Sequence, residues 1–159
     1  MIIISRCPYR ISLLGGGSDL DWFVKKNDYG YCLGYALSKY TYTVINELPN
    51  GSKRGILNYS SREEYTELNE IAHPLIKAAF KELDIKKFLE ISSFGFASGG
   101  AGLGGSSSFL IALLKGLSKF QKKELDNNEL AHLASNIDIY KLQKPVGRQD
   151  HFIAASGGF

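Results

Sequence analysis

The chain has 159 residues, of which 44% are hydrophobic and 22% charged, and this composition excludes a disordered or low-complexity protein. Its length suits one domain with a single core. The net charge of +3 comes from 19 basic and 16 acidic residues spread along the chain. Such a charge is too weak and diffuse for a nucleic-acid-binding surface, and it would suit an anionic small molecule.

The apolar runs and the cysteines bear on location and redox chemistry. No apolar run approaches the roughly 18 residues of a membrane-spanning helix. The N-terminus lacks the basic segment and the small-residue cleavage site of a secretory signal. We therefore expect a cytoplasmic protein without a membrane partner. Cys7 and Cys32 form neither a disulfide framework nor a C-x-x-C pair, so we assign both to packing.

Segments rich in isoleucine, tyrosine and threonine predict six strands. They lie at residues 1–5, 9–14, 31–37, 40–48, 55–59 and 88–94. Cys7 and Pro8 are expected to separate the first strand from the second. In the fourth, Thr41, Thr43 and Ile45 alternate with the residues between them, so one face of that strand should be buried.

Apolar residues at helical spacing predict three longer helices, at residues 71–83, 106–120 and 128–142. Pro145 and Gly147 should end the last of them. A short helix is expected at residues 20–25. The closing SGGF is typical of the entrance to another strand, and we find neither a repeat nor a linker.

The most informative segment is the glycine-rich run at residues 95–108, between a predicted strand and a predicted helix. Glycine lets a backbone approach phosphate oxygens closely and adopt positive φ, and a helix N-terminus attracts anions. Composition alone leaves a phosphate site and a flexible loop equally open. The Walker loop is excluded because no lysine lies between Phe94 and Leu114. The Rossmann spacing, with an acidic residue about 20 positions later, is not met either.

Within this run, the segment Ser98-Gly99-Gly100-Ala101-Gly102-Leu103-Gly104-Gly105-Ser106 resembles the phosphate loop of the GHMP kinases. This superfamily includes galactokinase, homoserine kinase, mevalonate kinase and phosphomevalonate kinase, and its loop is written P-x-x-x-G-L-G-S-S. The chain departs from that pattern at two positions. Ser98 replaces the proline, and Gly105 replaces the first serine.

Two further segments resemble motifs of the same superfamily. CPYRISLLGGGSDL, residues 7–20, is similar to its first motif, and KPVGRQDHF, residues 144–152, is similar to the segment with the catalytic aspartate. The triple glycine and the GRQD run most resemble the heptose 7-phosphate kinases. The resemblance covers nearly the whole chain but only the first half of such a kinase. We therefore expect residues 1–159 to be an N-terminal, ATP-binding domain whose C-terminal domain is absent.

The resemblance implies that Asp150 is the catalytic base and that Arg10 is the basic residue beside it. An arginine charge can stabilise an ionised aspartate and balance the negative charge of the transferring phosphoryl group. Without the resemblance, an aspartate at this position would more often start a helix than act in catalysis, and an arginine in a strand would more often be a surface charge.

The resemblance also implies sites for ATP, Mg²⁺ and the sugar. The ATP-binding residues would be Gly99, Gly100, Ala101, Gly102, Leu103, Gly104, Gly105, Ser106 and Ser107. Mg²⁺, which usually takes one or two protein ligands, would be held by Ser106 and by Asp138, where relatives have a glutamate. Read alone, Asp138 is a charge on a helix surface. The sugar would contact Gly16, Gly17, Ser18 and Asp19, although Ser18 and Asp19 can also cap the short helix that follows.

The implied fold is α+β, a mixed β-sheet with helices on one face, similar to the ribosomal-protein-like N-terminal domain of GHMP kinases. The implied activity is ATP-dependent phosphorylation of a sugar or sugar phosphate, with heptose 7-phosphate at its anomeric hydroxyl as the first candidate. Two alternatives stay open: a nucleotide-binding domain without turnover, and a GHMP kinase for another sugar or a non-sugar alcohol. The expected partners are a nucleotide and a sugar phosphate, with a homodimer or pairing with a C-terminal domain as further candidates.

Overall fold

A five-stranded mixed sheet forms one layer of the domain. The computed structural model describes residues 1–97 and 100–158. Its strands are β1 (Ile2–Leu14), β2 (Leu33–Glu47), β3 (Gly55–Asn58), β4 (Arg62–Tyr65) and β5 (Leu89–Gly95). They lie in the order β1-β2-β5-β3-β4. The β3–β5 pair is parallel and the other neighbours are antiparallel.

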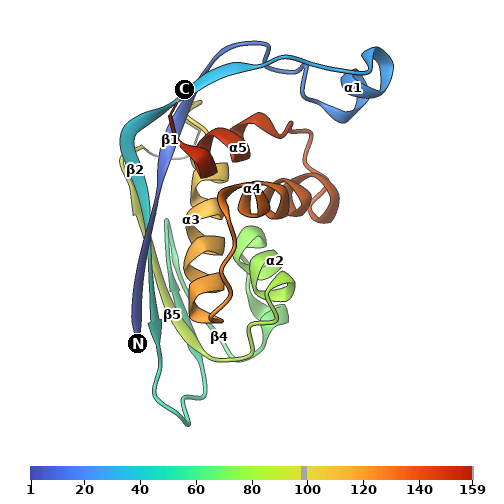
Figure 1. Ribbon diagram of the computed structural model, residues 1–159. Helices are drawn as coiled ribbons and strands as arrows, with labels where there is room; N and C mark the ends of the chain where they lie inside the picture. Colours follow the sequence, from blue (N-terminus) through green and yellow to red (C-terminus); the bar gives the residue numbers. More distant parts are fainter. Residues whose placement is uncertain (98–99, 159) are drawn as a thin grey trace.

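Helices form the second layer, on one face of this sheet (Figure 1). The helical segments are α1 (Asp21–Asn27), the 3₁₀ turn η1 (Leu68–Glu70), α2 (Pro74–Glu82), α3 (Gly105–Phe120), α4 (Asn127–Asn136), the π-helical turn η2 (Ile137–Lys141) and α5 (Gln149–Ser156). The helices α2 to α5 cover the sheet. The helix α1, which connects β1 to β2 in the chain, lies beyond the end of the sheet. This arrangement confirms the predicted α+β class. Within the described residues, no helix has the length and apolar character needed to cross a bilayer.

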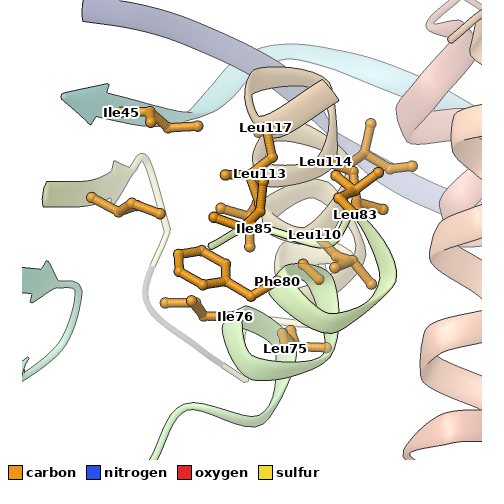
Figure 2. Close-up of a cluster of buried hydrophobic side chains, with 14 of the residues drawn as sticks. Ile45, Leu75, Ile76, Phe80, Leu83, Ile85, Leu110, Leu113, Leu114 and Leu117 are labelled. Atoms are coloured by element: carbon orange, nitrogen blue, oxygen red, sulfur yellow. The ribbon is translucent and has the colours of Figure 1, made fainter. Parts of the chain in front are cut away.

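Helix α3 is the centre of the core. Its leucines Leu110, Leu113, Leu114 and Leu117 are fully buried, and Figure 2 shows them grouped with Phe80 and other apolar side chains of the sheet and of α2. Burying each such side chain stabilises the fold by about 1.5–3 kcal/mol. The core therefore fixes the axis of α3, and with it the position of the glycine-rich segment that leads into this helix.

The predicted strand breaks are wrong at two places. Residues 1–14 form the single strand β1, and β2 is likewise continuous across residues 37–40. Pro8 is tolerated because β1 is the edge strand, where a missing N–H need not cost a ladder hydrogen bond. A register shift between Pro8 and Arg10 accommodates the irregularity. The predicted alternation in β2 is confirmed, since Thr41, Thr43 and Ile45 are all buried.

The helix predictions also need correction. Ser18 and Asp19 do not cap α1, because Leu20 occupies the cap position without a side-chain hydrogen bond. The predicted helix at 128–142 is α4 followed by the π-helical turn. The strand β4 was not predicted, whereas α5 agrees with the alternative that Asp150 could start a helix. The closing glycines do lie beside the sheet, because the carbonyl of Gly158 accepts a hydrogen bond from the Ala36 N–H of β2 at 2.8 Å.

Cys7 is a packed thiol, as predicted, and it leads to a testable alkaline effect. Its side chain is buried and its Sγ donates to the carbonyl of Ala154 in α5 at 3.0 Å. Burial raises the pKa of this thiol from 9.0 to about 12. Because the folded-state pKa is raised, the stabilisation is present below pH 9 and is lost as the pH rises toward 12.

We therefore expect the wild-type chain to lose about 1.4 kcal/mol more stability than Cys7→Ala between pH 8 and pH 10. Urea unfolding of both proteins at the two pH values measures this difference. Equal losses would show that the Cys7 thiol does not link folding to pH.

Candidate active site

The described part of the glycine-rich segment has the backbone of an anion-binding loop. Gly100, Gly102 and Gly104 have φ of 86°, 71° and 68°, which side chains other than glycine rarely adopt. A Cβ at Gly100 or Gly102 would meet nothing within 4 Å, so the backbone is open to a ligand there. The predicted ATP-binding residue Gly99 lies outside the described residues, as does Ser98.

The loop enters α3 at a terminus whose amide groups have few partners. Gly104 is the N-cap residue and provides no side chain, and the first turn contains no acidic residue. The N–H groups of a helix's first turn lack intrahelical acceptors, so they can bind an anion. Ser106 is exposed, whereas Ser107 is buried. The buried Ser108 donates its hydroxyl to the Pro8 carbonyl at 2.7 Å, which ties the helix to β1.

A cavity of about 550 Å³ adjoins this loop. Its walls come from β1, β2, β5, the β3–β4 turn, the start of α2, the start of α3 and the loop itself. They include Tyr9, Thr41, Tyr59, Ser60, His73, Phe94, Gly102, Leu103, Ser106 and Phe109. The volume suits a nucleotide-sized ligand. Tyr59 and Ser60 place the β3–β4 turn at the wall of this cavity.

His73 was missed by the sequence analysis, and it forms an aromatic wall of the cavity. Its ring lies between Tyr59, at 4.6 Å between centroids, and Phe109, at 5.3 Å. Burial lowers the pKa of His73, and the charge of Lys144 adds to that effect while Glu63 opposes it. The Ile76 amide donates to Nδ1 at 3.4 Å. His73 is thus a neutral, oriented ring that a planar ligand can contact.

Arg10 connects the loop to Asp150. Its Nε donates to Asp150 Oδ1 at 2.6 Å, and its Nη2 contacts the other carboxylate oxygen, so the pair is bidentate. Its Nη1 donates to the carbonyl of Gly102 at 2.9 Å, and its backbone amide donates to the carbonyl of Leu103 at 3.1 Å. The Asp150 side chain is 25% exposed, so a ligand can reach it. One arginine therefore places a carboxylate beside the candidate phosphate loop.

Asp19 also contacts the start of α5, through a hydrogen bond that the sequence did not predict. Its Oδ2 accepts the Gln149 amide at 2.9 Å, so it caps α5, 130 residues further along the chain. The carboxylate also lies directly on Gly147, where an added Cβ would stand 1.9 Å from Oδ2. Gly16 lies near the Gln149 side chain, which accepts a hydrogen bond from Ser12 at 3.1 Å. The predicted sugar-binding loop is thus held against the start of α5.

The other predicted sugar-binding residues have simpler surroundings. The Ser18 hydroxyl, which has one proton to donate, lies 2.8 Å from the carbonyl oxygen of Gly15 and 2.8 Å from that of Tyr31. Gly17 has φ of 98° and open space where a Cβ would be. Both residues shape the turn that carries Asp19 to α5.

Asp138 lies in a buried network. Lys144 donates to its Oδ1 at 2.6 Å, and His151 Nε2 lies 3.0 Å from its Oδ2. Burial raises the pKa of Asp138, but the hydrogen bonds from His151 and Lys144 outweigh burial and hold it below the ordinary value. The carboxylate side chain is only 3% exposed. It offers no accessible oxygen to a hydrated cation, so it does not fit the predicted Mg²⁺ site, whereas Ser106 is exposed and can be reached by one.

Together these features define a type of chemistry. An anion-binding loop at a helix N-terminus, an arginine and an accessible carboxylate meet at one end of α3 and α5. Phosphoryl transfer needs such an arrangement, because a loop must hold the phosphates while a carboxylate orients the acceptor hydroxyl. The geometry therefore suits a site for phosphoryl transfer.

Comparison with known proteins agrees with this class. The family described as the GHMP kinases N terminal domain matches residues 70–158. The chain belongs to this family.

Two relatives have names that mention heptose. The chain is 26% identical over 170 residues to a D-glycero-alpha-D-manno-heptose 7-phosphate kinase of Campylobacter jejuni, covering 99% of the chain and 49% of that relative. The crystal structure of a D-glycero-D-manno-heptose 1-phosphate kinase from Bacteriodes thetaiotaomicron superposes with a TM-score of 0.88 at 27% identity, covering 100% of this chain and 55% of that one.

The fold extends to more distant kinases. Methanococcus jannaschii mevalonate kinase has a TM-score of 0.73 at 24% identity, with coverage of 99% of this chain and 51% of that chain, which shows the shared fold. The chain spans about half the length of the relatives it matches. The predicted pairing with a C-terminal domain or a second copy stays a prediction.

Proposed function

We propose that the protein containing this chain is a cytoplasmic, ATP-dependent kinase that phosphorylates a sugar phosphate, with heptose 7-phosphate at its anomeric hydroxyl as the substrate. The observation that carries this proposal is the double role of Arg10, which bonds to two carbonyls of the glycine-rich loop and to Asp150. This residue sets the distance between a nucleotide held on the loop and a hydroxyl held on the carboxylate.

In the proposed reaction, the amide groups at the start of α3 hold the phosphates of ATP, with Gly100 and Gly102 giving the backbone room to approach them. Bound ATP supplies the phosphoryl group. Asp150 accepts the proton of the acceptor hydroxyl as the hydroxyl oxygen bonds to the γ-phosphorus and the bond between that phosphorus and the departing ADP breaks. The Arg10 guanidinium keeps the carboxylate in position and balances negative charge in the transition state. Mg²⁺ would neutralise phosphate charge when bound, and Ser106 is the residue here that could coordinate it.

Two considerations support a sugar phosphate as the acceptor. The two relatives named above carry heptose phosphate in their names. In addition, Asp19 presents a carboxylate at the amide of Gln149, the residue before Asp150, and a carboxylate can accept hydrogen bonds from two sugar hydroxyls.

The proposal is tested by measuring phosphoryl transfer from ATP to heptose 7-phosphate, unphosphorylated hexoses and mevalonate. We expect transfer to the heptose phosphate to have the highest kcat/KM. Activity confined to a non-sugar alcohol would overturn the substrate assignment and leave the kinase assignment intact. Nucleotide binding without transfer to any acceptor would favour the alternative of a binding domain.

A substitution at Gly147 distinguishes acceptor binding from nucleotide binding. Because the Asp19 carboxylate occupies the space of a Gly147 side chain, Gly147→Ala should displace Asp19 from the α5 terminus. Losing its charged hydrogen bonds to the sugar should raise the KM for the acceptor about 10- to 100-fold. The KM for ATP should stay within about 2-fold, as Gly147 lies outside the phosphate loop. A matched rise in both KM values would refute the placement of Asp19 at the sugar.

A further inference from the structure

The starting observation is the environment of Asp138, whose carboxylate has partners on two different segments. Lys144 belongs to the loop that precedes α5, and its ammonium bonds to Oδ1 at 2.6 Å. His151 belongs to α5 and bonds to Oδ2 at 3.0 Å. In addition, the Lys144 amide donates to the Asp138 carbonyl at 3.0 Å. Asp138 therefore holds both the loop that contains Lys144 and the helix α5, which follows this loop.

The His151 ring is wholly buried and has one hydrogen-bond partner among the described residues. Its Nδ1 has none. An ionised carboxylate only accepts hydrogen bonds, so the Nε2 that faces Asp138 carries a proton. The Asp138 contact thus fixes both the tautomer and the orientation of this ring.

His151 is the third of three successive residues that attach the first turn of α5 to other segments. Gln149 donates its amide to Asp19 in the loop after β1. Asp150 is bonded by Arg10 of β1, and His151 is bonded by Asp138 of the π-helical turn. The candidate catalytic carboxylate lies between the two other attachments. Arg148, at the N-cap, provides no side-chain hydrogen bond to this turn.

A magnesium ion has little access to Asp138. The side chain is 3% exposed, and an ion at Oδ1 would have to displace the Lys144 ammonium. Mg²⁺ loses its water reluctantly and usually keeps several water ligands, for which this buried carboxylate leaves no room. An aspartate, one methylene shorter than glutamate, also reaches less far from its helix.

We propose that Asp138 is a positioning residue, not a metal ligand: it holds His151 and Lys144 so that the first turn of α5 presents Asp150 to the acceptor hydroxyl. This inference rests on the proposed kinase function. It gives Asp138 a positioning role, whereas the family resemblance implies that this residue binds Mg²⁺. Removing the contact should loosen the first turn of α5 without altering the loop that holds nucleotide and metal.

The test compares Asp138→Asn, Lys144→Met, the double variant and His151→Leu with wild type. An amide has one acceptor oxygen for two donors, so Asp138→Asn either leaves Lys144 or His151 without an acceptor or forces His151 into its other tautomer, with a proton on the unpartnered Nδ1. We expect its kcat to fall about 10- to 100-fold, as for other small misplacements of a catalytic group. The dissociation constant of Mn²⁺ in the presence of a non-hydrolysable ATP analogue should change less than about 2-fold, because Mn²⁺ would bind at the loop.

Recovery of kcat in a second set of variants distinguishes a positioning role of Asp138 from other roles. In Asp138→Asn/Lys144→Met the single amide oxygen is free to accept from His151, so kcat should recover to within about 3-fold of the Lys144→Met value. His151→Leu should lower kcat about as much as Asp138→Asn, whereas His151→Gln, whose amide can reach Asp138, should keep most of it. Glu124→Gln, at an exposed site, is the control for the loss of one negative charge.

Two results would overturn the proposal. One is a Mn²⁺ affinity about 10-fold or more weaker in both Asp138 variants, without rescue, which would make Asp138 a metal ligand. The other is an unchanged kcat in His151→Leu. If wild type transfers no phosphoryl group, the proposed function fails separately. Hydrogen exchange of the Gln149–Phe152 amides then still tests the inference, with faster exchange expected in Asp138→Asn and His151→Leu and recovery in the double variant.

Discussion

Asp150→Asn is expected to lower kcat by about 10²- to 10⁴-fold, which corresponds to roughly 3 to 5 kcal/mol of barrier. The amide keeps the shape of the side chain but cannot accept the hydroxyl proton. ATP affinity should stay nearly intact, because Asp150 acts on the acceptor while the glycine-rich loop holds the nucleotide. Steady-state kinetics with heptose 7-phosphate and calorimetric titration with ATP measure the two quantities.

Arg10→Met should act at the same step. Arg10 makes a bidentate contact with Asp150, so removing the arginine already misplaces the carboxylate. The double variant should therefore be little worse than either single variant, because residues that work as a unit show strongly non-additive effects. Additive losses would show that the two residues act independently. An Asp150→Asn enzyme with near-normal turnover would refute the catalytic role altogether.

Local patterns in the sequence predicted the parts of the fold that depend on local physics. The alternation of Thr41, Thr43 and Ile45 predicted which face of β2 is buried, and apolar spacing predicted α2 and α3 nearly to their ends. Pro8 was misread because sequence does not reveal that β1 is an edge strand. A helix start at Asp150 was only an alternative, and the cap of α5 was not predicted because it is the Asp19 side chain, from 130 residues earlier in the chain.

The candidate site divides in a similar way. Its loop, Arg10 and Asp150 were found through motifs, and the structure brings them together. The surroundings of Asp138 and the aromatic wall at His73 were not found, because burial and ring contacts arise from packing between distant segments. A histidine immediately after Asp150 was the one available signal for the Asp138 network. Sequence spacing alone gives such a histidine no partner.

Gly104→Asp is expected to weaken ATP binding about 100-fold, or roughly 2.7 kcal/mol. Gly104 has φ of 68° and forms the N-cap of α3, and a Cβ there would lie 2.9 Å from Arg10 Cγ. Left-handed backbone strain of about 1–2 kcal/mol and displacement of Arg10 would distort the loop. The added negative charge would also repel phosphates at the positive end of the helix.

The matched control for this prediction is Gly51→Asp. Gly51 also has positive φ, at 90°, and nothing lies within 4 Å of an added Cβ. It belongs to the turn between β2 and β3, away from the residues of the cavity. Gly51→Asp therefore introduces the same charge with a similar backbone strain and should leave ATP affinity within about 2-fold of wild type. Equal ATP affinities for Gly104→Asp and wild type in calorimetric titrations would remove the loop from the nucleotide site. Equal losses in both variants would instead trace the effect to general destabilisation, since only the Gly104 substitution places a carboxylate where the phosphates are proposed to lie.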